Sequence, residues 1–210
     1  MRILYTASEA LPYAASGGLA DVAGSLPAAL CKAGHDCRVV LPLYKSVKPE
    51  LRKDLRFLMN FTVDVGWRKQ YCGVFEGHAN NVTYYLLDNE YYYARDGLYG
   101  FYDDCERFVF LSRAVMELIR HIDWKPQIIN CNDWQTALVP VYYQTYYKYQ
   151  HGYEDIKTVF TIHNIQYQGK YGMDVLNEVM GIPMYHANLL EYDGCINMMK
   201  GAFETADKIT

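Results

Sequence analysis

The sequence predicts an α/β protein built on a doubly wound, mostly parallel β-sheet. Short apolar runs alternate with longer segments in which apolar residues recur with a helical period, the pattern of strands connected by helices. Residues 56–87 instead alternate apolar with other residues and have only short connections, which indicates an antiparallel β insertion. The chain has 210 residues, 51% of them hydrophobic, which is enough to bury a sizeable core.

The first 36 residues predict a strand, a loop and a helix. Residues 3–5 suit a buried strand, and the loop 14–18 lacks large side chains, so a ligand such as phosphate can reach backbone N–H groups where the helix begins. We expect Pro27 to kink this helix and Gly34 to end it before a strand at residues 37–41. The predicted apolar stripe of the helix comprises Val22, Leu26, Ala29, Leu30 and Ala33.

The middle of the chain predicts three strands, a loop and a long helix. Alternating apolar residues at 57–65 and short apolar runs at 71–75 and 82–86 predict a meander. Residues 88–101 are rich in tyrosine and glycine and too rich in turns for a regular element, so we expect a functional or capping loop. A helical stripe with an acidic first turn then extends from residue 103 to residue 122.

The last part of the chain predicts two buried strands and a less regular segment. The strands cover residues 128–131 and 158–162, and a helix over residues 134–147 separates them. Residues 174–200 are expected to be helical or irregular. Residues 206–210 look like the beginning of another buried strand, so we expect the chain to be a fragment of a longer protein.

Composition and charge exclude several classes of partner. With 20 basic and 24 acidic residues and a net charge of −4, the chain has no basic footprint for nucleic acid or anionic lipid. No apolar run is long enough to cross a membrane, and Glu9 follows the first apolar run closely, unlike a secretory signal, so we expect a cytoplasmic protein. The six cysteines lack the spacing of a zinc site and are expected to be buried free thiols.

Polar residues gather where three predicted parallel strands end. The loop Ser16-Gly17-Gly18, the pair Asn132 and Asp133, and the pair His163 and Asn164 each follow one of these strands. Since ligands of an open parallel sheet bind beyond the carboxyl ends of its strands, we expect the three clusters to meet. Each cluster has another interpretation, because the glycines could form a tight turn, Asp133 could cap a helix, and His163 could be a satisfied residue at the sheet edge. Their coincidence favours a site.

The sequence also contains 21 tyrosines, whose rings could stack on sugars. Most of them are expected to pack in the core or lie on the surface. The tyrosines of the helix at residues 134–147 and Tyr149 are expected to cover the sheet or contact a missing domain. Only Tyr99, in the glycine-rich loop, is singled out as a candidate ligand contact.

Nine short motifs in a fixed order are together highly specific for one enzyme family. They are SEALP at residues 8–12, SGGLADV at 16–22, SLP at 25–27, GHD at 34–36, LYG at 98–100, DCERF at 104–108, NDWQTA at 132–137, TIHNIQYQG at 161–169 and ADKIT at 206–210. With them the chain resembles the amino-terminal half of bacterial glycogen synthase and plant starch synthase, retaining glucosyltransferases of the two-domain GT-B type. The resemblance implies that residues 1–210 are a truncated amino-terminal, acceptor-side, Rossmann-like domain and that the carboxyl-terminal nucleotide-binding domain is absent.

The resemblance also implies an activity and a set of site residues. The expected reaction is transfer of glucose from ADP-glucose to the non-reducing end of an α-1,4-glucan, with retention of configuration and without a metal or other cofactor. The glycine loop would approach the donor diphosphate, and His163 would lie against the donor glucose. The residues assigned in this way are His163 and Asp133 as catalytic residues, and Ser16, Gly17, Gly18, Tyr99 and Asn164 as substrate-binding residues.

The chain departs from the family at the glycine loop, where Ala15 replaces a lysine and Ser16 a threonine. Loss of a charged hydrogen bond worth roughly 1.5–3 kcal/mol predicts a loss of about one to two powers of ten in donor use. One alternative is therefore a non-catalytic glucan-binding protein that lost the lysine at position 15. A dinucleotide oxidoreductase is disfavoured, because the first loop lacks the required glycine spacing and residues 41–44 lack the acidic residue. Without a second domain to close the cleft, the isolated chain is expected to be inactive.

Overall fold

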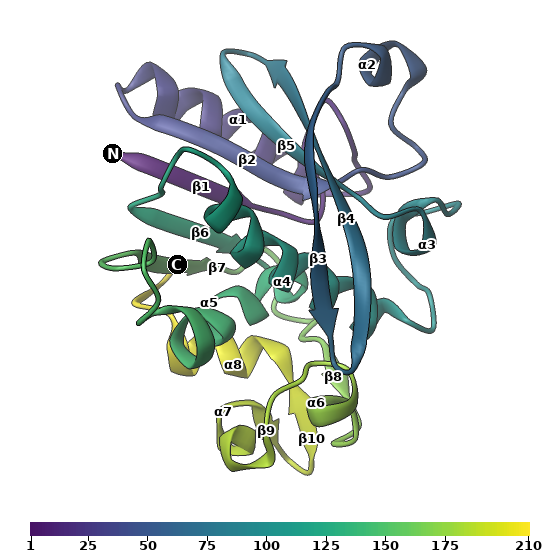
Figure 1. Ribbon diagram of the computed structural model, residues 1–210, viewed down its shortest axis with the longest axis vertical. Coiled ribbons are helices and arrows are strands. Elements are labelled where there is room, and N and C mark those ends of the chain that lie inside the picture. Colours follow the sequence, from purple (N-terminus) through teal and green to yellow (C-terminus); the bar gives the residue numbers. More distant parts are fainter.

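A computed structural model describes all 210 residues and has an eight-stranded sheet as its main element (Figure 1). The strand order is β11-β7-β6-β1-β2-β5-β4-β3. Neighbouring strands from β11 to β5 are parallel, and β4 and β3 extend the same sheet as antiparallel strands. The bounds are β1 Arg2–Thr6, β2 Asp36–Pro42, β3 Arg56–Val65, β4 Arg68–Ala79, β5 Val82–Asp88, β6 Ile128–Asn132, β7 Lys157–Thr161 and β11 Lys208–Ile209. The predicted α/β class with a mostly parallel sheet is confirmed.

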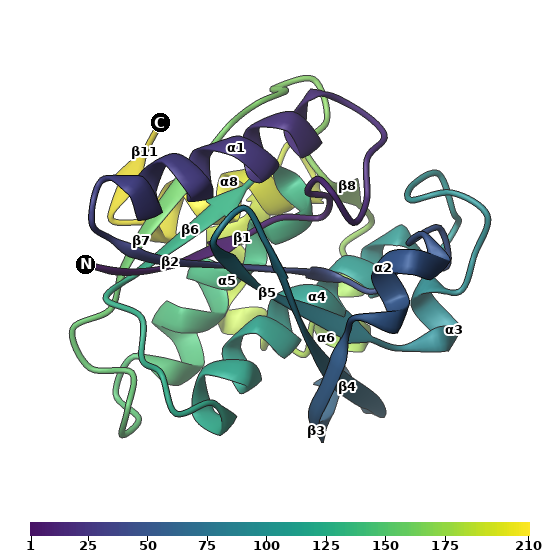
Figure 2. The ribbon, with the colours of Figure 1, turned by 90° about the horizontal axis from the view of Figure 1, so that it is seen from above.

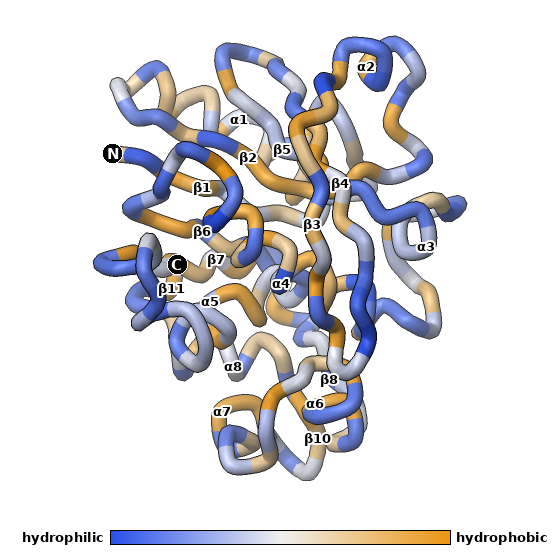
Figure 3. Tube along the Cα trace, in the orientation of Figure 1, coloured by the Kyte–Doolittle hydropathy of each residue, from blue (hydrophilic) through white to orange (hydrophobic).

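Helices cover both faces of this sheet, as a doubly wound fold requires. Helix α1 (Gly18–Lys32) lies on one face, and α4 (Asp104–His121) and α5 (Leu138–Tyr142) lie on the other (Figure 2). Helix α8 (Met198–Thr205) packs against α5. The central strands β1 and β6 are apolar over much of their length (Figure 3), as expected of parallel strands that are covered on both sides.

The predicted antiparallel insertion is confirmed, and it is continuous with the parallel sheet. Strand β5 pairs antiparallel with β4 and parallel with β2, so it joins the two parts. The β3–β4 hairpin ends in Gly66, whose φ is +57°. A Cβ atom at this position would lie 2.0 Å from the carbonyl oxygen of Glu178, so only glycine fits where the hairpin tip meets α6 (Val175–Glu178).

Helix α1 ends at the predicted place but buries a different face from the one predicted. Its buried residues are Leu19, Ala20, Ala23 and Pro27. Leu26, predicted in the apolar stripe, is 42% exposed. Apolar residues occur on both sides of this helix, so periodicity alone did not identify its inner face. The inner face is mostly small because α1 packs closely: a Cβ on Gly24 would lie 2.8 Å from the Cβ of Leu11.

The single helix predicted over residues 134–147 is wrong. The segment divides into a 3₁₀ turn, η1 (Trp134–Thr136), then α5, then a π-helical turn, η2 (Tyr143–Tyr147). In this wider turn the Tyr143 and Tyr147 rings are buried. The Tyr143 hydroxyl donates to the Tyr153 carbonyl at 3.2 Å. Tertiary packing of these large side chains therefore overrides the simple helical period.

The remaining elements are short, and several were not predicted. Three strands form a separate small sheet near the foot of Figure 1, although residues 174–200 are predicted to be helical or irregular. Strands of two or three residues are too short to show a period of two. These elements are α2 Pro49–Lys53, α3 Glu90–Tyr93, β8 Lys170–Tyr171, η3 Met184–His186, α7 Ala187–Leu190, β9 Glu191–Tyr192 and β10 Cys195–Asn197.

All six cysteines are free; four are buried, as predicted, whereas Cys31 and Cys195 are partly exposed. None of the helices combines the length and the apolar content that a membrane crossing needs.

Candidate functional site

A cavity of about 970 Å³ lies beyond the carboxyl ends of β1, β6 and β7. All seven residues predicted for the site line it: Ser16, Gly17, Gly18, Tyr99, Asp133, His163 and Asn164. The prediction that the strand-end clusters meet at one edge of the sheet is therefore confirmed. The role of each residue in a reaction stays a prediction.

The glycine loop forms one wall of the cavity, at the start of α1. Gly17 has an extended backbone and precedes the first helical residue, Gly18. A Cβ on Gly18 would meet no atom within 4 Å, so protein packing does not explain the glycine. Helix geometry leaves the first N–H groups without intrahelical acceptors, and with the helix dipole they attract anions. This wall is suited to phosphate groups.

Glu9 is a cavity residue that the sequence prediction missed. The residue is only 3% exposed, and its Oε2 accepts a hydrogen bond from the backbone N–H of Ser16. A Cβ on Gly17 would lie 3.8 Å from Oε1 of the same carboxylate. None of the ion pairs in the structure involves Glu9. Because Glu9 follows β1, the strand-end rule that selected Asp133 and His163 would also have found it.

Asp133 does not act as a side-chain helix cap, which corrects the simpler interpretation of this residue. Its carboxylate makes no capping hydrogen bond to η1. Oδ1 instead accepts hydrogen bonds from the backbone N–H groups of His163, at 2.7 Å, and Asn164, at 3.1 Å. Asp133 thereby connects the end of β6 to the turn after β7.

The backbone of Asp133 is strained. Its φ and ψ of +56° and −178° lie in a region that is essentially restricted to glycine and costs about 1–3 kcal/mol for other residues. The surrounding hydrogen bonds hold it there, because Asp133 N donates to Thr161 O at 3.0 Å and Thr136 N donates to Asp133 O at 3.1 Å. Such strain concentrates at functional sites.

The buried side chain of Asn132 fixes the orientation of the His163 ring. Asn132 Nδ2 donates to the carbonyl of Thr6 at 2.9 Å, so its Oδ1 is the acceptor that faces His163 Nε2 at 2.9 Å. The Tyr5 hydroxyl donates to the same oxygen at 3.0 Å. His163 Nε2 is therefore the donor in this contact, which leaves Nδ1 as the ring nitrogen that Asn132 does not engage.

Tyr99 contributes a neutral hydroxyl to the cavity. This hydroxyl lies 2.7 Å from Ser8 Oγ, and the ring packs 5.9 Å from the ring of Phe108. Burial raises the pKa of the Tyr99 phenol well above its ordinary value, and the Glu9 carboxylate raises it further. Tyr99 therefore acts as a hydrogen-bonding group rather than as a base at neutral pH.

The cavity combines three kinds of group that suit a phosphorylated, hydroxylated ligand. The helix amino terminus can bind phosphate, the groups on Asp133, His163 and Asn164 can bind hydroxyls, and the rings of Trp134 and Tyr167 also line the cavity. No group of three or more His, Cys, Asp or Glu side chains is arranged to hold a metal ion.

Comparison with known proteins gives one consistent result. A family model described as the starch synthase catalytic domain matches residues 2–210. A glycogen synthase of Clostridium botulinum is 50% identical over all of this chain and 45% of its own length, and one of Geobacillus stearothermophilus is 45% identical over all of this chain and 44% of its own length. The chain thus spans somewhat less than half the length of these curated relatives.

A solved structure supports the same assignment. The catalytic domain of starch synthase IV from Arabidopsis thaliana superposes with a TM-score of 0.89 at 29% identity, over 99% of this chain and 44% of that chain. The match confirms the expected Rossmann-like fold of GT-B glucosyltransferases. The chain belongs to the starch synthase catalytic domain family.

Proposed function

We propose that residues 1–210 are the amino-terminal, acceptor-side domain of a retaining glucosyltransferase that transfers glucose from ADP-glucose to the non-reducing end of an α-1,4-glucan. The observation that carries the proposal is the cavity in which the start of α1 and the strand-end residues Asp133, His163 and Asn164 meet. The similarity to glycogen synthases supports it, as does the Arabidopsis structure, which was obtained with ADP and acarbose.

In this reaction the glycine loop stabilises the departing diphosphate. As the glycosidic bond breaks, negative charge grows on the diphosphate, so the fixed N–H dipoles at Gly17 and Gly18 interact more strongly in the transition state than in the ground state. Because they are already oriented by the helix, they need no rearrangement during the step. The expected family mechanism requires no metal.

His163 and Asp133 hold the transferred glucose in the proposed site. His163 lies against the sugar. Asp133 orients His163 by accepting hydrogen bonds from the backbone N–H groups of residues 163 and 164. Asp133 and Tyr99 line the sugar or acceptor side of the cleft, and Asn164 is a further substrate-binding residue. A carboxyl-terminal nucleotide-binding domain is proposed to supply the opposite wall, which is consistent with relatives of about twice this length.

The full-length protein, incubated with ADP-glucose and a maltooligosaccharide, is expected to lengthen the oligosaccharide by glucose units. The 210-residue chain alone is expected to show no elongation, because half of the cleft is missing. Product length is measured by chromatography, and His163→Ala in the full-length protein is the inactive control. A full-length protein that binds the oligosaccharide but never elongates it would instead be a glucan-binding protein. Elongation by the isolated chain would contradict the two-domain assignment.

A further inference from the structure

Tyr99 lies in the loop between α3 and α4. The backbone of this loop does not by itself fix the loop's conformation. Gly97 and Gly100 on either side of Tyr99 have φ of +116° and +90°, in the left-handed region that favours glycine. Cβ atoms at these two glycines would meet nothing closer than 3.8 Å. The position of the Tyr99 hydroxyl in the cavity therefore depends on contacts from outside the loop.

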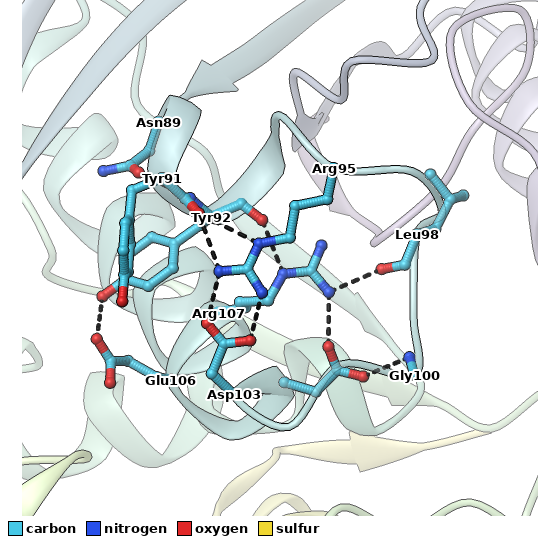
Figure 4. A network of polar contacts seen from close by, with 10 residues as sticks. Asn89, Tyr91, Tyr92, Arg95, Leu98, Gly100, Asp103, Glu106 and Arg107 are labelled. Carbon is cyan, nitrogen blue, oxygen red and sulfur yellow. Dashed lines mark hydrogen bonds and ion pairs between the residues drawn. The ribbon is translucent and has the colours of Figure 1, made fainter.

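Ser8 and Phe108 contact the Tyr99 side chain itself. The backbone on either side of Tyr99 is held by Asp104 and by Arg107 on α4; Figure 4 labels Arg107 together with Leu98 and Gly100. Arg107 is completely buried, and its Nη1 donates to the Leu98 carbonyl at 3.0 Å and to Asp104 Oδ1 at 2.6 Å. Asp104 Oδ2 accepts the N–H of Gly100 at 2.8 Å. The residues before and after Tyr99 are thus both bonded to the same ion pair.

The geometry of Arg107 suits this task better than that of another cation. Its Nε donates to the Tyr92 carbonyl at 2.8 Å, so one planar group connects the end of α3 with the loop. The guanidinium carbon lies 4.8 Å from the centre of the Phe101 ring, and the whole residue is inaccessible to solvent. A lysine could not reproduce these separated, fixed donors.

Stability alone is a weak explanation for a buried ion pair at this place. Removing a guanidinium and a carboxylate from water carries a desolvation penalty, and apolar residues of similar volume are often equally stable or more stable. The pair does, however, fix the direction of a loop that reaches the cavity.

We propose that Arg107 and Asp104 are positioning residues, which hold Tyr99 in the orientation that the glucosyl transfer requires. The inference rests on the proposed function, since it assigns Tyr99 to the substrate cleft. The nearby Arg95 acts differently. It makes a bidentate pair with Asp103, at 2.5 and 2.6 Å, and has no bond to Leu98 or Gly100.

A double-mutant cycle in the full-length protein tests this link kinetically. Arg107→Lys is expected to lower acceptor kcat/KM about 10- to 100-fold, the effect of displacing a substrate-positioning group. In a Tyr99→Ala background the same substitution is expected to cost less than about twofold, because its effect passes through Tyr99. Independent, multiplicative losses would overturn the proposal.

Arg113→Lys is the matched control, because Arg113 lies on the same helix, α4, and packs its guanidinium on Tyr142 and Tyr146 at 4.3 and 4.7 Å. It touches neither the loop nor the cavity, so kcat/KM should be unchanged. If Arg107→Lys does not fold, Asp104→Asn replaces it. Arg107 and Gly100 donate to different oxygens of Asp104. Asparagine has only one acceptor oxygen and so cannot accept both hydrogen bonds in this geometry.

Hydrogen exchange tests the same link without catalysis. Peptides covering residues 96–102 should exchange at least about tenfold faster in Arg107→Lys than in the wild type or in Arg113→Lys. If the wild type does not use ADP-glucose, the proposed function fails. The exchange measurement still tests whether Arg107 and Asp104 hold the Tyr99 loop in place. In an active enzyme, faster exchange with unchanged acceptor kinetics would overturn the positioning role. Unchanged exchange would show that Arg107 and Asp104 do not hold the Tyr99 loop in place.

Discussion

Asp133→Ala and Asp133→Gly are expected to reduce glucosyl transfer by the full-length protein equally, by about 100-fold or more. Both remove the carboxylate that holds the N–H groups of His163 and Asn164 at 2.7 and 3.1 Å. Each charged hydrogen bond is worth roughly 1.5–3 kcal/mol, and its loss frees the turn that presents His163 to the cavity. Steady-state kcat with ADP-glucose is the measurement.

The same two substitutions are expected to differ in stability. Glycine relieves the strain at φ +56°, whereas alanine keeps a Cβ atom there. After allowance for the greater freedom of glycine in the unfolded chain, Asp133→Gly should be about 1–2 kcal/mol more stable than Asp133→Ala in urea unfolding. Asp133→Asn, which keeps an acceptor oxygen, should lose less activity than either. Equal stabilities of the glycine and alanine variants would show that the strain is absent.

Ala15→Lys is expected to raise kcat/KM for ADP-glucose by about 10- to 100-fold, the worth of one charged hydrogen bond. Ala15 is exposed on the glycine loop, directly before Ser16. Ser16 in turn is bonded to the buried carboxylate of Glu9, which has no ion-pair partner. A lysine at position 15 would add positive charge to a cavity whose lining includes the Ser16 hydroxyl and backbone N–H groups but no lysine or arginine.

Ala15→Gln, similar in length but uncharged, is the control for this substitution and should leave kcat/KM within about threefold of the wild type. The gain from lysine should also decrease at high salt, since the loop is exposed. No change with lysine would mean that the charge is supplied elsewhere or is not needed. A gain in stability without a gain in kcat/KM would mean that the lysine pairs with Glu9 instead.

The sequence predicts the sheet and the position of the cavity because both follow from simple rules. Strands β1, β6 and β7 each contain a short apolar stretch that is largely buried, and parallel strands bring their carboxyl ends to one edge. The polar residues after β6 and β7 therefore had to be neighbours, whatever the details of the loops.

What the sequence could not show depends on tertiary contacts. The inner face of α1 is set by its close packing on Leu11, and the carboxylate of Asp133 is directed by an unusual backbone conformation. Arg107 looks like an ordinary charged residue in a helical pattern, yet it is completely buried. No local pattern records which side chain a loop carbonyl will meet across the fold.

The strand order also has a consequence for folding. Strands β3, β4 and β5 follow one another in sequence and pair as neighbours, whereas Ile3 pairs with Ile128 and closes a long loop. Local pairs form sooner, because distant ones must first overcome loop-closure entropy. In pulse-labelled refolding, amides of β3–β5 are therefore expected to become protected before those of β1 and β6; simultaneous protection would contradict this order. The cavity would then be among the last parts of the molecule to form, since its walls are attached to β1, β6 and β7.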